Sequence, residues 1–259
     1  MSTKTPKKRQ SALNRRQNLH GRKARVKTSP QQGLHDHTRA ATGRADTTTS
    51  PSSKAPPKPP QNGYFIWGHH AIKAALANPE RRIANLFASP ESSAWLATQI
   101  AALPASRQAE LPMTQSIDKP RLDAIGQPDD KAVHQGVAAA VWPLDPPHLD
   151  DFLPGLGAGR VRLVLLDQLE DPRNVGAIMR SARAFGVQAV ITTFRNTVEE
   201  TGALARAASG ALDDLPLIRV VNLARAIEQL QAHDIVVAGL AGNGKKPVAA
   251  LAAHERLGI

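Results

Sequence analysis

A polar stretch that follows a buried-looking strand carries the side chains best suited to chemistry. Asp171, Asn174 and Arg180 come soon after the apolar run 161–166. A largely apolar run of this length is typical of a strand buried on both faces of a parallel sheet. Open α/β sheets bind ligands outside the carboxyl ends of their strands, so we expect these side chains at a ligand-binding edge. There an arginine can stabilise negative charge, and an asparagine can both donate and accept hydrogen bonds.

The element that must position these side chains is a helix. Pro172 suits a first helical turn, apolar residues such as Ile178 and Ala182 recur at helical spacing, and Gly186 can end the helix as a C-terminal cap. The pattern predicts a helix over 176–185, directly after the polar loop.

A purely structural interpretation of the same residues is also open. Asn174 could cap the helix, and Arg180 could form a surface ion pair with Asp171 or Glu170. Spacing alone does not separate this alternative from a catalytic site.

The rest of the chain predicts an α/β protein with two units. Strands and helices alternate after residue 160, which predicts a parallel sheet with helices on both faces. The expected elements there are strands at 161–166, 189–193, 217–220 and 235–239 and helices at 176–185, 200–208 and 223–232. A smaller α/β unit is predicted from segments at 64–67, 71–77, 83–88, 92–103 and 136–141. The expected organisation is a tail at 1–60, the smaller unit at 61–143, a Pro/Gly-rich linker at 144–159 and the larger unit at 160–259.

The chain's net positive charge comes entirely from the tail. Residues 1–60 hold 14 basic and 2 acidic side chains, a net of +12, whereas residues 61–259 hold 19 and 20, a net of −1. Rich in Pro, Ser, Thr and Gln, the tail cannot bury enough apolar surface to fold, so we expect it to be disordered. Such a polycation binds phosphates by releasing counterions, and the alternative is a solubilising extension or a targeting peptide.

Composition excludes several classes of function. The chain has no cysteine, which removes disulfides and thiolate chemistry and suits a reducing cytoplasm. Its nine histidines include no convincing pair at metal-ligand spacing, so no metal site is expected. No apolar run approaches the roughly 20 residues needed to span a bilayer, so no membrane association is expected.

Residues 171–186 read Asp-Pro-Arg-Asn-Val-Gly-Ala-Ile-Met-Arg-Ser-Ala-Arg-Ala-Phe-Gly. This string closely resembles the first signature motif of the SpoU/TrmH-type RNA 2'-O-ribose methyltransferases of the SPOUT superfamily. Residues 63–76 and 134–138 resemble the opening and closing segments of the extra substrate-binding domain found in members that modify ribosomal or transfer RNA. Residues 206–216 resemble the family's segment before its next helix.

The resemblance implies a fold and an activity. The smaller unit would be an RNA substrate-binding domain, and the larger one a SPOUT methyltransferase domain. The implied reaction transfers a methyl group from S-adenosylmethionine to a ribose 2'-hydroxyl of RNA. The most similar members act on a guanosine of 23S ribosomal RNA, and transfer RNA is the other substrate class.

The resemblance also implies roles for individual residues. Arg180 and Asn174 match the catalytic positions. Arg206, Asp171 and Arg173 are expected to contact RNA. The family's turn after the strand at 235–239 lies beside the methyl donor, which makes two residues there, Gly239 and Leu240, cofactor candidates.

Two later family motifs, G-x-E-G-x-G and S-L-N-V-S, do not occur before the sequence ends at Ile259. In the family they thread the trefoil knot that holds most of the cofactor pocket and the dimer interface. The expectation is therefore a domain truncated before the cofactor-binding knot, and a homodimer where the knot is complete. The alternative function is an RNA-binding protein without methyl transfer activity.

Overall fold

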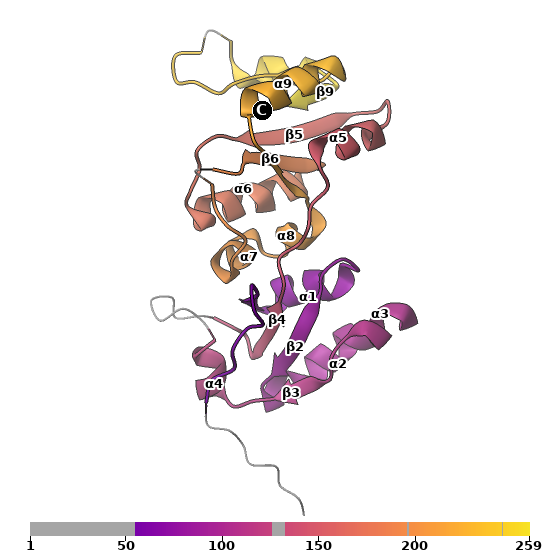
Figure 1. Cartoon of the computed structure of the whole chain (residues 1–259), viewed down its shortest axis with the longest axis vertical. Helices are drawn as coiled ribbons and strands as arrows, with labels where there is room; N and C mark the ends of the chain where they lie inside the picture. The colour runs from indigo at the N-terminus through magenta and orange to yellow at the C-terminus, as the bar shows by residue number, and fades with distance from the viewer. Residues whose placement is uncertain (1–54, 126–132, 196, 245) are drawn as a thin grey trace, which may run out of the picture. The chain divides into compact units, whose positions relative to one another are not determined.

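A computed structural model describes residues 55–125, 133–195, 197–244 and 246–259. Nearly all of the predicted basic tail lies outside these residues. The prediction that the tail is disordered therefore concerns residues that the structure does not describe. The described residues belong to one compact unit, Ser52–Ile259. Its elements form two sheets (Figure 1).

The first sheet is small and mixed, with strand order β1-β4-β2-β3. Strand β4 runs antiparallel to β1 and β2, while β2 and β3 are parallel. Its elements are β1 (Tyr64–Trp67), α1 (His69–Ala77), β2 (Ile83–Ala88), η1 (Pro90–Ser92), α2 (Ser93–Ala101), α3 (Ala105–Glu110), β3 (Thr114–Ser116), α4 (Lys119–Asp123) and β4 (Val137–Val141).

The second sheet has five strands in the order β7-β6-β5-β9-β8, and every neighbouring pair is parallel. Its elements are α5 (Leu149–Phe152), η2 (Leu153–Leu156), β5 (Val161–Leu166), α6 (Pro172–Ala184), β6 (Ala189–Thr193), α7 (Gly202–Ala208), α8 (Ala211–Asp214), β7 (Leu217–Val220), α9 (Leu223–Ala232), β8 (Val236–Val237), η3 (Val248–Ala253) and β9 (Arg256–Gly258). The predicted α/β class with a parallel sheet is therefore confirmed.

The side chains of β5 are buried in two different hydrophobic cores, because successive residues of a strand point to opposite faces of the sheet. Val161 and Leu163 are buried together with residues of α5 and α9 on one face. Leu166 is buried on the other face, in a core that contains Val175 and Met179 of α6. Helices therefore cover both faces of the second sheet.

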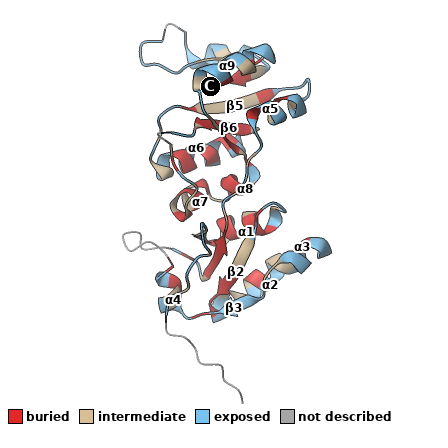
Figure 2. Cartoon of the chain, in the orientation of Figure 1, coloured by how far each residue is buried: buried red, intermediate tan, exposed pale blue. Residues whose placement is uncertain are grey.

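The core on the α6 side is continuous with the core of the first sheet. It joins Ile66 and Leu86 of the first sheet to Leu204 of α7 and Met179 of α6. Helices α1, α6, α7 and α8 accordingly all carry buried residues (Figure 2). The two sheets share one hydrophobic core in this unit.

The segment 144–159, predicted as a linker, contains helix α5 and the short 3-10 helix η2. Leu149 and Leu153, one helical turn apart, are buried in the α9-side core of the second sheet. These apolar contacts make the segment part of the second sheet's structure rather than a bare spacer.

The helices in the described part of the chain are all too short or too polar to cross a lipid bilayer.

Candidate functional site

Helix α6 is fixed at both ends by its own sequence. The Asp171 carboxylate accepts a hydrogen bond from the backbone N–H of Arg173 at 2.9 Å, and Pro172 occupies the first helical position. At the other end Gly186 has φ +70°, a conformation that glycine adopts without strain, and its N–H donates to the Arg183 carbonyl at 3.1 Å. The predicted cap at Gly186 is confirmed, and the helix begins earlier than residue 176.

The structure contradicts the purely structural interpretation of Asn174 and Arg180. The residue that caps α6 is Asp171, while Asn174 lies inside the first turn. Arg180 is exposed, and within the described residues it forms no ion pair with Asp171 or Glu170. Neither side chain makes the helix cap or the ion pair that this interpretation requires.

Asn174 and Arg180 can converge on a ligand only because the arginine is long. Six positions along one helix separate them by about 9 Å along the axis and about 120° around it. Helical side chains lean toward the N-terminus, so the Arg180 side chain is inclined toward the turn that carries Asn174. Both are exposed and both follow the carboxyl end of β5.

Gly176, inside the signature motif, serves the packing of α6 against α7. A Cβ atom placed there would lie 2.5 Å from the Ala207 Cβ and 2.8 Å from the Ala208 backbone nitrogen. Such spacing leaves no room for a side chain, so the two helices approach closely at this point. Arg206 precedes Ala207 in the last turn of α7, which places it next to the helix that carries Arg180.

We expect Gly176→Ala to destabilise the protein, although alanine is normally the better helix former. The added methyl group would press on backbone atoms of α7, and overpacking of this kind costs about 1–3 kcal/mol. Chemical denaturation of the parent and the variant measures the change. Gly159→Ala is the matched control, because a Cβ at Gly159 meets nothing within 4 Å. Equal stability of the two variants would contradict this account of the motif's glycine.

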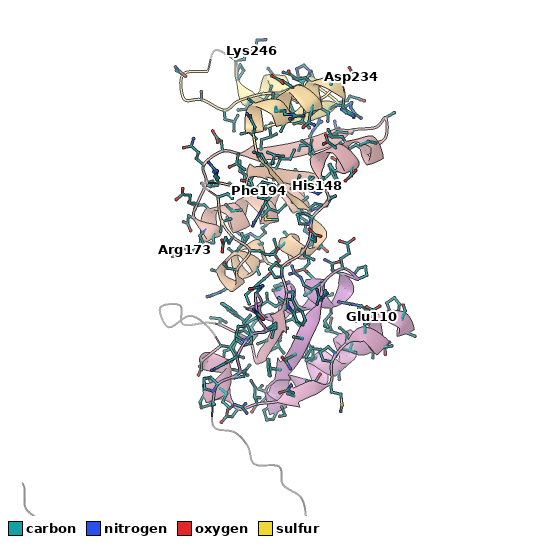
Figure 3. The ribbon with its side chains drawn as sticks, viewed as in Figure 1. Glu110, His148, Arg173, Phe194, Asp234 and Lys246 are labelled. Carbon is teal, nitrogen blue, oxygen red and sulfur yellow. The ribbon has the colours of Figure 1, made fainter. Side chains whose placement is uncertain are left out.

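Arg173 and Asp171 form a loose, exposed pair at the start of α6. Arg173 Nε and Asp171 Oδ1 are 3.7 Å apart, and the Arg173 side chain is 81% exposed. Figure 3 labels Arg173 near α6. A pair this open to water contributes little to stability, so Arg173 is available to a ligand. Asp171 has a structural task as the helix cap that the sequence analysis did not assign to it.

Gly239 and Leu240 follow β8, and therefore lie on the same sheet edge as the start of α6. Strand β9 separates β8 from β5, which places the two strands roughly 10 Å apart. A Cβ at Gly239 would meet nothing within 4 Å, and Leu240 is 66% exposed. The backbone at Gly239 is therefore open, and Leu240 presents exposed apolar surface beside it.

A cavity of about 740 Å³ lies away from these residues. Its walls come from the ends of β1 and α1, the segment 143–148 and the chain around α8, and none of the predicted site residues lines it. Several carboxylates face it, among them Glu80, Glu199 and Asp214. Because carboxylates repel phosphate, we do not assign RNA to this cavity.

No group of three or more His, Cys, Asp or Glu side chains within the described ranges could hold a metal ion.

The order of the elements defines an α/β protein with a small mixed sheet ahead of a five-stranded parallel sheet. A solved structure of similar fold is the SpoU methyltransferase AviRb from Streptomyces viridochromogenes, with a TM-score of 0.59 and 19% identity over 76% of this chain and 71% of that chain. Another is an AdoMet-bound rRNA methyltransferase from Sinorhizobium meliloti, with a TM-score of 0.53, 19% identity, and coverage of 76% of this chain and 78% of that chain.

Two family models match the two parts of the chain. The SpoU rRNA Methylase family matches residues 162–258, and the RNA 2'-O ribose methyltransferase substrate-binding family matches residues 65–147. A protein from Staphylococcus epidermidis, whose name places it in the TrmH family of tRNA/rRNA methyltransferases, is 41% identical over 130 residues, covering 49% of this chain and 52% of that protein. The chain thus spans about half the length of the curated relatives it matches.

The chain belongs to the SpoU/TrmH family of RNA 2'-O methyltransferases and carries the family's N-terminal substrate-binding domain.

Proposed function

We propose that this protein transfers a methyl group from S-adenosylmethionine to a ribose 2'-hydroxyl of ribosomal or transfer RNA. Within that class we propose a guanosine of large-subunit ribosomal RNA as the target. The observation that carries the proposal is the exposed Arg180 on α6, at the carboxyl edge of a SpoU-family sheet. The family resemblance also leads us to propose a homodimer in the cytoplasm.

S-adenosylmethionine would lie at the edge where β8 ends, with Gly239 and Leu240 against it. When bound, it supplies an electrophilic methyl group on a sulfonium centre. The open backbone at Gly239 lets a ligand approach closely, and the exposed Leu240 side chain offers apolar surface.

Arg180 would act on the oxygen that receives the methyl group. As the new C–O bond forms, the bond between the methyl carbon and the sulfonium sulfur would break and the 2'-hydroxyl proton would pass to solvent water, so that negative charge develops on the 2'-oxygen. A guanidinium group remains charged at physiological pH, so it is a poor proton acceptor and a good partner for this charge. Asn174 would orient the ribose through its amide.

RNA would be held by the first sheet and by basic side chains near α6. Arg173 is exposed beside Asn174, and Arg206 lies on the helix packed against α6. Asp171 would contribute by holding Arg173 near the site. The tail's net charge of +12 adds attraction for phosphate that carries no sequence preference.

The test is transfer of a tritiated methyl group from S-adenosylmethionine to purified ribosomal and transfer RNA. We expect incorporation into one of these RNAs, and resistance to alkaline cleavage at the modified ribose, because a 2'-O-methyl group blocks attack on the adjacent phosphate. Tight RNA binding without incorporation would identify an RNA-binding protein instead. Calorimetric titration with S-adenosylmethionine, done in parallel, shows whether cofactor binding or the transfer step fails.

A further inference from the structure

Arg81 is a fully buried arginine in the turn between α1 and β2. Its side chain is 0% exposed, and its Nε donates to Asp213 Oδ1 at 2.6 Å. Its Nη1 donates to Glu200 Oε1 at 2.6 Å and to the Trp142 carbonyl at 2.8 Å. One guanidinium group thus joins two carboxylates and a backbone carbonyl.

The partners of Arg81 come from both parts of the chain. Tyr64 lies in β1 and Trp142 directly follows β4, whereas Glu200 precedes α7 and Asp213 lies in α8. The Tyr64 hydroxyl also donates to Glu200 Oε1 at 2.5 Å. We call Tyr64, Arg81, Glu200 and Asp213 the Arg81 cluster.

A second buried arginine holds the turn that carries Arg81. Arg107 Nη2 donates to the Arg81 carbonyl at 2.8 Å, and its Nε donates to the Leu76 carbonyl at 3.0 Å. Arg107 therefore holds the Arg81 backbone to the part of the chain that forms the first sheet. From there the Arg81 side chain extends to Glu200 and Asp213.

Two glycines show how closely α7 and α8 approach the first sheet. A Cβ at Gly202 would lie 2.3 Å from the Phe65 carbonyl oxygen and 2.4 Å from the Trp67 ring. Gly210 has φ +89°, and a Cβ there would lie 2.9 Å from the His70 carbonyl oxygen. Neither position leaves room for a side chain.

The same helix α7 packs on α6 at Gly176, so close contacts run from the first sheet to the helix that carries Arg180. We propose that Arg81 is a positioning residue that fixes the substrate-binding sheet on α7 and α8, so that RNA held by that sheet reaches Arg180 at one set distance. The role in RNA delivery rests on the proposed function, whereas the fixed attachment does not.

Arginine suits this task better than lysine. Its planar fork directs N–H groups toward Asp213 and Glu200 at once, while an ammonium group offers only a point charge. Arg81→Lys should therefore hold the two parts together only incompletely.

The attachment can be tested by electron–electron distance measurements on spin labels. The chain has no native cysteine, so Met113→Cys and Phe185→Cys, at positions 90% and 83% exposed, place one label in each part of the full chain. We expect a single narrow distance peak for this pair. Arg81→Ala should cause loss of the single peak, and Arg81→Lys should broaden it less.

Two further variants keep the outcome clear. Glu200→Gln with Asp213→Asn removes both charges at nearly constant shape, and it serves as the test if Arg81→Ala fails to fold. Arg225→Ala, an exposed arginine on α9, is the control and should keep the narrow peak. A broad distribution in the parent, or a narrow one in every cluster variant, would overturn the proposal. Because the labels report distance alone, a failure of methyl transfer leaves this result unaffected.

Discussion

Replacing Arg180 with alanine should reduce methyl transfer by about 10²–10³-fold, the usual cost of removing one group that stabilises developing negative charge. The side chain is exposed on α6 and makes no ion pair with its acidic neighbours Asp171 and Glu170, so its loss should leave the fold intact. Single-turnover transfer of labelled methyl groups to the RNA substrate measures the effect on the chemical step.

Arg183→Ala is the matched control for Arg180→Ala, because it removes an exposed arginine one turn along the same helix. Arg183 pairs with Asp214, a surface contact that contributes little to stability. Arg180→Lys should retain part of the activity, since it keeps the charge and loses the planar fork. An Arg180→Ala enzyme as fast as the Arg183→Ala control would remove Arg180 from the mechanism.

Arg81→Ala should lower the free energy of unfolding by about 3–5 kcal/mol near neutral pH, because it leaves two buried carboxylates without their cation. Burial alone would lower the pKa of Arg81, but Asp213, Tyr64 and Glu200 around it raise that pKa above its ordinary value. Burial also raises the pKa of Asp213 even beside the guanidinium, and it raises the pKa of Tyr64, whose hydroxyl is next to Glu200. In the Arg81 cluster, one guanidinium group faces two carboxylates, so the positive charge does not balance the negative charge even before Arg81 is removed.

The deficit in Arg81→Ala should shrink as the pH falls from about 8 to about 5. A carboxyl group whose pKa is raised by folding stabilises the protein while it is protonated, and that stability is lost as the pH rises through the folded-state pKa. Burial raises the pKa of Asp213, so without the guanidinium this carboxyl group is accommodated better in its protonated form. Denaturant unfolding across this pH range measures the change.

Arg107→Ala separates this electrostatic effect from the loss of a buried side chain. Arg107 is also buried, but its interior partners are the carbonyl groups of Ala75, Leu76 and Arg81. Its removal should destabilise the protein by an amount that changes little with pH. The same pH-independent deficit in Arg81→Ala would contradict the charge-based account of the cluster.

Three strands of the second sheet were predictable from the sequence to the residue. The bounds of β5, β6 and β7 match the predicted strands, and α9 matches its predicted helix. In each of these segments, the local pattern of apolar residues is strong enough to determine the secondary structure. The short helix α3 was missed because its six residues include only two apolar ones, and it is held by the buried Arg107 instead of an apolar stripe.

The candidate site was predictable where it is local in sequence, since the motif places Asn174 and Arg180 on one helix after one strand. The Arg81 cluster was not predictable in this way. Arg81 is 119 residues from Glu200 and 132 from Asp213, and nothing near any of them marks a shared partner. Only the folded chain shows which arginine pairs with which carboxylates.

The order of strands in the second sheet also sets an order of assembly. Strands β5, β6 and β7 are neighbours that can pair as soon as each has been synthesised, but the strand that pairs with β8 in the described sheet is β9, which comes after it. Until Leu257 leaves the ribosome, β8 and the turn at Gly239 have no strand to join. The edge that we propose for the cofactor therefore forms only after β9 has been synthesised, later than the helix that carries Arg180.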